Sequence, residues 1–322
     1  MANEVRGNAP ERVRQALAAL GEQADAYVQA GKAGSTRRAY ASDWQDFLAW
    51  ADWRGLAGLP AEPSTVALYL AALAVDGKRP ATIERRRAAI AFAHKVAGHI
   101  SPTHHAMVDE VIAGIRRELG AAQHGKTPAL SADVRAMVER LPGDLRGARD
   151  RALLLLGFAG AFRRSELVAL DVEDVLEAPA GLLITIRRGK TDQEGRGRRL
   201  AIPYGQHAAS CPVRAYQDWR HAAALTSGAL FRGISSHGQL LGRLSDKGVA
   251  RTVKRAAEAA GLDPARYSGH SLRAGLATSA AAGGALDRDI MRQTGHQRVE
   301  TLYRYIRKED LFTDNVVRRT DL

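Results

Sequence analysis

Four separated segments of the sequence carry side chains that could act together on a phosphate ester. Two segments contain polar pairs at helical spacing, because Arg163 and Glu166 are three residues apart and so are His270 and Arg273. Residues at that spacing lie on one face of a helix. The candidate residues, in chain order, are Arg163, Glu166, Lys190, His270, Arg273, His296 and Tyr305.

These residue types match what phosphodiester cleavage without a metal ion requires. Two arginines can hold the non-bridging oxygens through charge-assisted hydrogen bonds as negative charge builds up. A tyrosine phenol can attack phosphorus and form a covalent intermediate. Nearby cations would lower its pKa from about 10, a histidine could take or share its proton, and a lysine could protonate the leaving 5′ oxygen. The set indicates phosphoryl transfer with no metal and no other cofactor.

Two tyrosines compete for the role of nucleophile. Tyr303 and Tyr305 are two positions apart in the segment GHQRVETLYRYIR (295–307). Residues at this spacing point in very different directions on a helix, so one active site can normally use only one of them.

The elements that would position these residues are predicted to be mainly helical, with one small sheet. In GLLITIRRGKTDQEGRGRRLAIP (181–203), apolar and polar residues alternate on both sides of a glycine-rich turn. This pattern predicts a β-hairpin that carries Lys190. The apolar run 152–162 predicts a buried core helix and is too short to span a bilayer. Helices are also predicted at 131–141, at 147–160 and after the hairpin.

The N-terminal part is predicted to form a separate helical domain. Apolar residues recur at helical spacing, and Ser, Thr or Pro stands near several of the expected starts. The expected helices are 35–53, 62–77, 79–98 and 104–119. A polar stretch with glycine and proline then predicts a linker. The expected boundaries are an extension at 1–34 too short for its own core, a helical DNA-binding domain at 35–120, a linker at 121–130 and a catalytic domain at 131–322.

The composition favours a polyanionic partner. The chain has 322 residues, which suggests two domains, and a net charge of +12. Such an excess suits nucleic acid, although a basic protein without this partner would show the same charge. The single cysteine, Cys211, excludes an internal disulfide or a cysteine-rich zinc site, and we expect it to be structural. No apolar signal region begins the chain, so we expect a soluble protein in the cytoplasm of a bacterial or phage-infected cell, associated with the nucleoid and not with a membrane.

At its candidate residues the sequence resembles the tyrosine site-specific recombinases, also called the phage integrase family. The family pattern has an arginine followed three residues later by an acid, a hairpin lysine, a His-x-x-Arg pair, a Gly-His or Gly-Trp, and a tyrosine nine residues further on. These places are filled in order by Arg163, Glu166, Lys190, His270, Arg273, His296 and Tyr305. The resemblance therefore selects Tyr305 as the nucleophile and makes Tyr303 a packing residue beside it. Glu166 is expected to orient a neighbouring cation.

The resemblance also implies a fold, a reaction and an assembly. Two domains would clamp duplex DNA that carries inverted-repeat target sites. A 3′-phosphotyrosine link would form without ATP, and strand exchange would pass through a Holliday junction. Four protomers would act on two sites. A C-terminal seam would dock on a neighbouring protomer, through Leu311, Val316 and Val317. Base contacts are expected from Arg85, Arg86 and Lys247.

Alternatives remain at each level. An Arg-x-x-Glu pair is often a surface ion pair, His270 could be a core histidine, and Lys190 could contact phosphate only. Arg85, Arg86 and Lys247 could lie on solvated helix faces, and the C-terminal helix could pack on its own domain. A telomere resolvase or type IB topoisomerase would use the same covalent chemistry. A noncatalytic DNA-binding factor on a recombinase scaffold would leave no adduct, and the completeness of the set argues against it.

Overall fold

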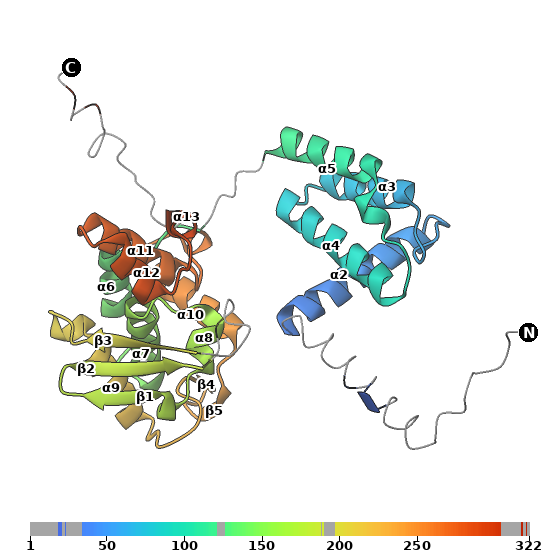
Figure 1. The fold of residues 1–322 in the computed structure, drawn as a ribbon. Coiled ribbons are helices and arrows are strands. Elements are labelled where there is room, and N and C mark those ends of the chain that lie inside the picture. The colour runs from blue at the N-terminus through green and yellow to red at the C-terminus, as the bar shows by residue number, and fades with distance from the viewer. Residues whose placement is uncertain are drawn as a thin grey trace, which may run out of the picture. The chain divides into compact units, whose positions relative to one another are not determined.

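The chain forms two compact units that divide between His124 and Gly125 (Figure 1). The computed structural model describes residues 19, 20, 23, 34–120, 126–187, 189, 197–303, 317 and 320. Each unit has its own large hydrophobic cluster, and the two clusters share no residue. The predicted division into a helical N-terminal part and a mostly helical C-terminal part with a small sheet is confirmed.

Residues 34–120 of the first unit form a bundle of four helices around an aromatic and aliphatic core. The helices are α2 (Gly34–Asp52), α3 (Pro63–Val75), α4 (Pro80–Val96) and α5 (Ala106–Leu119), with a short 3₁₀ helix at Pro102–His104. Pro63 and Pro80 each begin a helix, where the missing amide costs no hydrogen bond. Phe47, Tyr69 and Ile90 are fully buried between the helices. The four predicted helices are confirmed, with ends that differ by one or two residues.

A buried histidine joins two parts of this bundle. The backbone amide of Ala61 donates to Nε2 of His94 at 2.9 Å, and Nδ1 lies 2.9 Å from the carbonyl oxygen of Ile90. Because Nε2 accepts a hydrogen bond, the proton of the neutral ring is on Nδ1, which donates to Ile90. The ring thus fixes the segment before α3 to the last turn of α4.

We expect His94→Ala to lower the free energy of unfolding by about 2–4 kcal/mol, because it leaves a cavity and an unpaired backbone amide. His99→Ala is the matched control, since His99 is exposed just beyond the same helix. Urea unfolding of the full chain measures both variants. Equal stability of the two variants would contradict the structural role of His94.

The second unit contains eight helices and two small antiparallel sheets among its described residues. Its helices are α6 (Ser131–Glu139), α7 (Leu145–Ala159), α8 (Arg164–Ala169), α9 (Pro212–Ala222), α10 (Asp246–Ala259), α11 (Ser271–Ala282), α12 (Asp287–Thr294) and α13 (Val299–Tyr303). Its strands are β1 (Val175–Ala178), β2 (Gly181–Ile186), β3 (Arg198–Pro203), β4 (Arg232–Ile234) and β5 (Leu240–Arg243). Short 3₁₀ helices lie at Val172–Asp174, Ala208–Ser210 and Pro264–Arg266.

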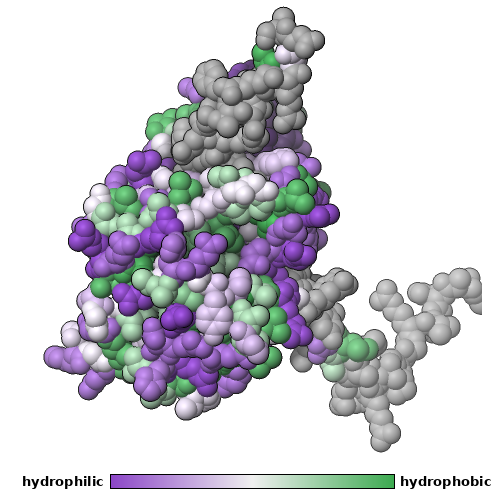
Figure 2. All heavy atoms as spheres, turned by 90° about the vertical axis from the view of Figure 1, so that its left-hand side faces the viewer, coloured by the Kyte–Doolittle hydropathy of each residue, from purple (hydrophilic) through white to green (hydrophobic). Residues whose placement is uncertain are grey.

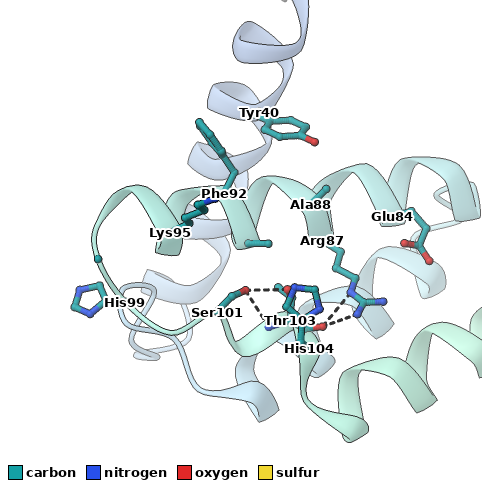
Figure 3. A pocket seen from close by; sticks show the side chains of 12 residues that line it. Tyr40, Glu84, Arg87, Ala88, Phe92, Lys95, His99, Ser101, Thr103 and His104 are labelled. Atoms are coloured by element: carbon teal, nitrogen blue, oxygen red, sulfur yellow. Dashed lines mark hydrogen bonds between the residues drawn. The ribbon is translucent and has the colours of Figure 1, made fainter. Parts of the chain in front are cut away.

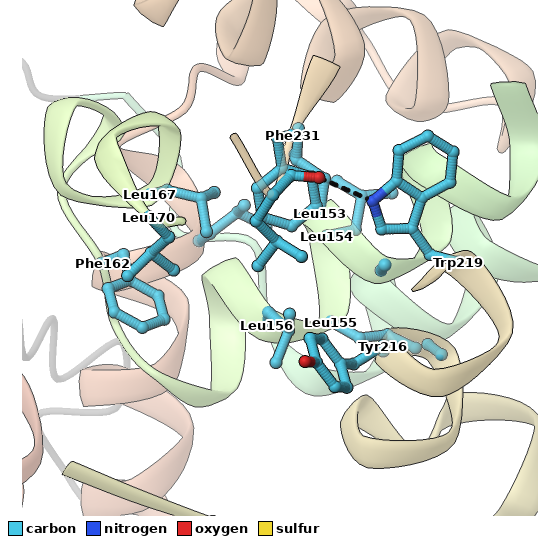
Figure 4. Packing of buried hydrophobic residues seen from close by; sticks show 14 of the residues in the cluster. Leu153, Leu154, Leu155, Leu156, Phe162, Leu167, Leu170, Tyr216, Trp219 and Phe231 are labelled. Carbon is cyan, nitrogen blue, oxygen red and sulfur yellow. Dashed lines mark hydrogen bonds between the residues drawn. The ribbon is translucent and has the colours of Figure 1, made fainter. Parts of the chain in front are cut away.

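Helix α7 is the centre of the second core. Four consecutive leucines, 153–156, are buried, as expected where a helix is apolar on every side (Figure 4). Trp219 of α9 packs in the same cluster, and its indole nitrogen donates to the carbonyl oxygen of Leu230 at 2.9 Å. The predicted core helix is therefore confirmed, and it ends one residue before the turn that leads to Arg163.

The predicted β-hairpin is confirmed as strands β2 and β3. They pair in antiparallel register with Ile184 opposite Leu200. Strand β1, on the other side of β2, was not predicted, because only the first of its four residues is buried and no alternation marks it. The β4–β5 pair was missed for a related reason, since these strands have three and four residues and none is fully buried.

The second unit begins before the predicted boundary at residue 131. The amides of Thr127 and Ala129 donate to the carbonyl oxygens of Arg266 and Ser271, both at 2.9 Å. Ala129 is fully buried, and a Cβ on Gly275 would lie 1.7 Å from its carbonyl oxygen. The second half of the predicted linker therefore packs on the catalytic part. Backbone pairing produces this contact, and it leaves no periodic pattern in the sequence.

The surface of the second unit is mixed in character. Figure 2 shows hydrophilic side chains spread over the face that lies to the left in Figure 1, with hydrophobic side chains in small areas between them. Within the described ranges, no helix is both long enough and apolar enough to cross a membrane.

Candidate active site

A buried carboxylate fixes the first candidate arginine. Arg163 is the N-cap residue of α8, and its backbone amide donates to Oε2 of Glu166 at 3.0 Å. Its guanidinium Nη1 donates to Oε1 of the same carboxylate at 2.5 Å. The Glu166 side chain is 1% exposed and that of Arg163 is 18% exposed. One acid thus holds both the start of the helix and the charged group, which makes this pair far more than a surface ion pair.

The second candidate arginine is tied to the same turn. Arg273, on α11, is fully buried, and its Nη1 donates to the carbonyl oxygen of Ala161 at 2.8 Å. Ala161 is a buried non-glycine residue with φ of +47°. A left-handed alanine costs roughly 1–2 kcal/mol, and here it turns the chain after α7 toward Arg163. Two arginines far apart in the sequence therefore meet at one loop.

His270 is exposed at the start of α11, where it is the N-cap residue. Its backbone amide donates to Oγ of Ser268 at 3.2 Å. The alternative that His270 is a core histidine is therefore wrong. His270 and Arg273 lie three residues apart in the first turn of α11, as predicted. His270 is exposed to solvent, whereas Arg273 is buried.

His296 is buried and held in one tautomer. The hydroxyl of Thr294 donates to the carbonyl oxygen of Ile290 at 2.7 Å and lies 2.9 Å from Nδ1 of His296. Because the hydroxyl has a single proton, it accepts from Nδ1–H, and the lone pair of the neutral ring is on Nε2. Burial, followed by the charges of Arg273, Arg163, His270 and Arg198, lowers the pKa of His296 to about 4. The neutral imidazole can accept a proton at Nε2, and an anionic phosphate bound beside it would raise its pKa from this low value toward the range of a general base.

Arg198, the first residue of β3, was not among the residues predicted from the sequence. Its Nη1 donates to the carbonyl oxygen of Gln293 at 3.0 Å, and its Nη2 is 3.9 Å from Oε2 of Glu166. Burial lowers the pKa of Arg198, and the charge of Arg163 adds to this effect. The alternation of the strand could have identified it, because Arg198 lies on the same face of β3 as the buried Leu200 and Ile202.

Strand β2 is anchored where it leads into the hairpin turn. Arg187 donates through Nη2 to Asp171 Oδ2 at 2.5 Å and to the carbonyl oxygen of Ala169 at 3.0 Å. The other carboxylate oxygen of Asp171 accepts from Arg243 at 2.5 Å, and the bond from Arg243 is the main cause that lowers the pKa of Asp171. Helix α8, the hairpin and β5 are thereby connected through one acid.

Tyr303 is not the packing residue that was expected. Its side chain is 55% exposed, and its phenol donates to Oδ2 of Asp287 at 2.6 Å. This hydrogen bond raises the pKa of Tyr303, which is opposite to what a nucleophile needs. The neighbouring Leu302 is the buried one, against Ala277 and Ile290. The outward position follows from the geometry of a short helix, in which adjacent residues point about 100° apart.

Several predicted residues lie outside the described part of the chain. They are Lys190, Tyr305, Leu311 and Val316. Val317 is described and is half exposed. The structure therefore brings together Arg163, Glu166, His270, Arg273 and His296, and the catalytic roles of all seven candidate residues stay predictions.

The predicted base-contacting arginines engage acids of their own unit. Arg85, whose side chain is 43% exposed, bonds Asp43 at 2.6 Å. Arg86 is 13% exposed and donates to both Asp46 and the phenol of Tyr69. Lys247, in the second unit, is exposed in the first turn of α10. Arg85 and Lys247 are available to a partner, whereas Arg86 also holds α2, α3 and α4 together.

Cys211 is buried, and its sulfur accepts from the amide of Gly205 at 3.2 Å, as a structural residue would. Among the residues that the structure describes, no group of three or more His, Cys, Asp or Glu side chains could hold a metal ion.

Comparison with known proteins identifies the family. Residues 130–311 match the phage integrase family. An integrase/recombinase XerD homologue of Selenomonas ruminantium is 42% identical over 297 residues, which covers 91% of this chain and 87% of that protein. The tyrosine recombinase XerD of Caulobacter vibrioides is 29% identical, with 88% and 90% covered.

Solved structures show the same fold. A lambda integrase (75–356) dimer bound to a COC′ core site superimposes with a TM-score of 0.59 at 19% identity, covering 90% of this chain and 94% of that one. The XerH recombinase in a post-cleavage complex with palindromic difH substrate gives 0.57 at 17% identity, with 80% and 70% covered.

The chain therefore belongs to the phage integrase family, and the predicted resemblance is confirmed. It is a tyrosine recombinase similar to XerD and XerC, an enzyme class that cleaves and rejoins DNA.

The low pKa of His296 makes stability depend on pH. Between about pH 6.5 and about pH 4 the unfolded chain binds a proton at this histidine, whereas the folded chain does not. The free energy of unfolding should therefore fall as the pH drops through this window and level off below it. Urea unfolding at several pH values checks this for the wild type, for His296→Asn and for the control His207→Asn, whose histidine is exposed. Only His296→Asn should flatten the slope, and an unchanged slope would contradict the buried neutral ring.

Proposed function

We propose that the protein is a site-specific DNA recombinase in which Tyr305 is the nucleophile. The observation that carries the proposal is the meeting of Arg163, Arg273 and His296 around one loop, with four cations acting on His296. Buried positive charge of this kind suits the anionic transition state of phosphoryl transfer. The position of Tyr305, nine residues after His296, rests on the family pattern.

The proposed reaction keeps the energy of the phosphodiester bond in a covalent protein–DNA link. The phenol oxygen of Tyr305 attacks phosphorus, the bond from phosphorus to the 5′ oxygen breaks, and a 3′-phosphotyrosine link forms. His296, whose Nε2 is the acceptor, takes the phenol proton, and Lys190 gives a proton to the leaving 5′ oxygen. Arg163 and Arg273 hold the non-bridging oxygens, with His270 at the exposed side of the site. Because the link retains the ester energy, the reverse attack by a 5′-hydroxyl needs no ATP.

The proposed biological reaction exchanges strands between two DNA sites. A 5′-hydroxyl from the partner duplex attacks the link, and two such rounds pass through a Holliday junction. We infer a simple, Cre-like recombinase that acts as four protomers on two inverted-repeat sites, with the C-terminal segment docked on a neighbouring protomer. The palindromic substrate of XerH and the core-site dimer of lambda integrase support this arrangement by analogy within the family.

DNA contacts in the first unit are proposed along α4. Arg85 lies on its exposed face. A groove of about 710 Å³ on the same unit is lined by α4 and the segment that follows it (Figure 3). Arg87, Lys95 and His104 border this groove together with Glu84, and Arg87 is paired with Asp109 at 2.5 Å. A groove with this balance of charge suits a phosphate backbone. Lys247 is the proposed contact from the second unit.

Two other functions make different predictions for the same protein. A noncatalytic DNA-binding factor would bind DNA and leave no covalent adduct. A telomere resolvase or type IB topoisomerase would form the adduct but give hairpin ends or relaxed circles. The match of relatives over most of the chain favours the recombinase.

The nucleophile is tested by covalent capture. The purified protein is incubated in EDTA with nicked fragments of DNA from its native genome and neighbouring mobile elements. After detergent treatment, DNA attached to protein is sequenced. We expect captured fragments to share an inverted repeat around a short spacer. Tyr305→Phe should abolish the adduct while DNA binding is kept, because the attacking oxygen is lost.

Tyr303→Phe is the matched control, since its phenol is exposed and bound to Asp287. It should keep both binding and capture. Adduct from the 305 variant but none from the 303 variant would reverse the assignment. Strict dependence on magnesium would contradict the proposed chemistry. Binding without adduct from folded wild-type protein would favour the noncatalytic factor.

The two arginines of α4 should separate binding from stability. Arg85→Gln should weaken DNA binding about tenfold with the smaller loss of stability, because the Arg85 side chain is 43% exposed and its buried partner Asp43 keeps Arg86 at 3.8 Å. Arg86→Gln should also lower the free energy of unfolding by about 1–3 kcal/mol, since Asp46 and Tyr69 lose their shared donor. Filter binding at two salt concentrations and urea unfolding measure the two effects. Equal losses of stability would contradict this division of roles.

A further inference from the structure

Arg198 is a charged residue on the core-facing side of a strand. In β3 its side chain takes the same face as the buried Leu200 and Ile202, while Arg199 is exposed on the other face. Only 24% of the Arg198 side chain is accessible. Burying a guanidinium is costly unless other groups hold it, so its contacts should have a function.

The first contact is with the turn that carries His296. Nη1 of Arg198 donates to the carbonyl oxygen of Gln293 at 3.0 Å, in the last turn of α12. The next turn residue, Gly295, has φ of +70°, and a Cβ built there would lie 3.1 Å from Nε and 3.2 Å from Cζ of Arg198. The guanidinium therefore lies against the backbone immediately before His296. Glycine serves both the left-handed conformation and this close approach.

The second contact is with the carboxylate that holds Arg163. Nη2 of Arg198 is 3.9 Å from Oε2 of Glu166, so the two charges attract each other without a hydrogen bond. This Nη2 atom is buried and, within the described residues, donates to no acceptor. Because it is closed off from solvent, it is not placed to bind a DNA phosphate directly. Its effect on a reaction would pass through Glu166 and the His296 turn.

We propose that Arg198 is a positioning residue for DNA cleavage, which fixes the turn before His296 and the carboxylate of Glu166 against strand β3. The inference rests on the proposed roles of His296 and Arg163. It adds a third arginine to the site, one that acts through its neighbours and not on the substrate. It also makes strand β3 a support of the catalytic geometry, in addition to its place in the hairpin.

A charge effect accompanies this geometric role. Among the described residues, the charged groups that most lower the pKa of His296 are Arg273 from α11, Arg163 before α8, His270 at the start of α11 and Arg198 from β3. All four disfavour a second proton on the imidazole, after burial itself. Removal of Arg198 should therefore raise the pKa of His296, and restoration of the charge alone should reverse that shift.

The test compares Arg198→Gln, Arg198→Lys and the control Arg199→Gln, which removes the same charge from the outward face of the same strand. The pKa of His296 is measured by NMR titration of the DNA-free protein, and thermal unfolding reports the fold. The single-turnover rate of adduct formation is then measured at saturating protein on a captured nicked site, from pH 3.5 to pH 9, so that the range includes the pKa of the wild-type His296. DNA affinity is measured on the same site.

We expect Arg198→Gln to raise the pKa of His296, to move the acid limb of the rate profile to higher pH, and to slow cleavage about 10- to 100-fold with little loss of DNA affinity. Arg198→Lys should restore the pKa and the acid limb but not the full rate, because an ammonium cannot reproduce the contact with the turn. Arg199→Gln should match the wild type in pKa and cleavage rate.

An Arg198→Gln variant that is folded and matches the wild type in both the pKa of His296 and the cleavage rate would overturn the inference. If that variant unfolds, Arg198→Lys decides, since a wild-type rate in that variant would show that the fork of the guanidinium is not needed. The NMR titration does not depend on activity. A wild-type protein that forms no adduct refutes the proposed function, whereas a folded Arg198→Gln variant with both an unshifted His296 and a wild-type cleavage rate refutes this inference alone.

Discussion

The buried carboxylate of Glu166 is the group on which the site depends. It accepts from the backbone and the guanidinium of Arg163 and attracts Arg198 from strand β3. Loss of the acid would leave two partly buried cations without their counter-charge, at a cost of several kcal/mol. The same acid begins helix α8, so the electrostatic arrangement and the local fold have one origin. The negative charge of Glu166 thus holds the positive charges of Arg163 and Arg198 close together.

The repulsion between these positive charges lowers the stability of the folded state. The large hydrophobic core of the second unit compensates for this cost. Arg273 is buried, His296 is kept neutral, and Ala161 adopts a left-handed conformation. All three features cost free energy in the absence of DNA and are typical of functional sites. Helix α7, with its buried leucines, ends immediately before this loop and provides a rigid support. An anion bound between the arginines would relieve part of the repulsion.

Much of this organisation could be predicted from the sequence, because strong periodicity reports burial directly. The four N-terminal helices, the core helix around Leu154 and the β2–β3 hairpin all have such a pattern. The short strand β1 and the docking of Ala129 have none, since backbone hydrogen bonds form them. Arg198 was missed because a motif search follows conspicuous spacing, whereas its role comes from strand alternation. The outward direction of Tyr303 required the acid partner Asp287, sixteen residues away.

The two separate hydrophobic cores have a consequence for how such a protein changes over time. No residue of the cluster around Phe47 belongs to the cluster around Leu154. Side chains in the first bundle can be repacked without disturbing the loop that holds Arg163 and Arg273. Substitutions can therefore accumulate in the first unit during evolution while the residues around Arg163 and Arg273 in the second unit stay unchanged. Recombination between genes at the boundary near His124 would exchange whole cores and avoid hybrid ones.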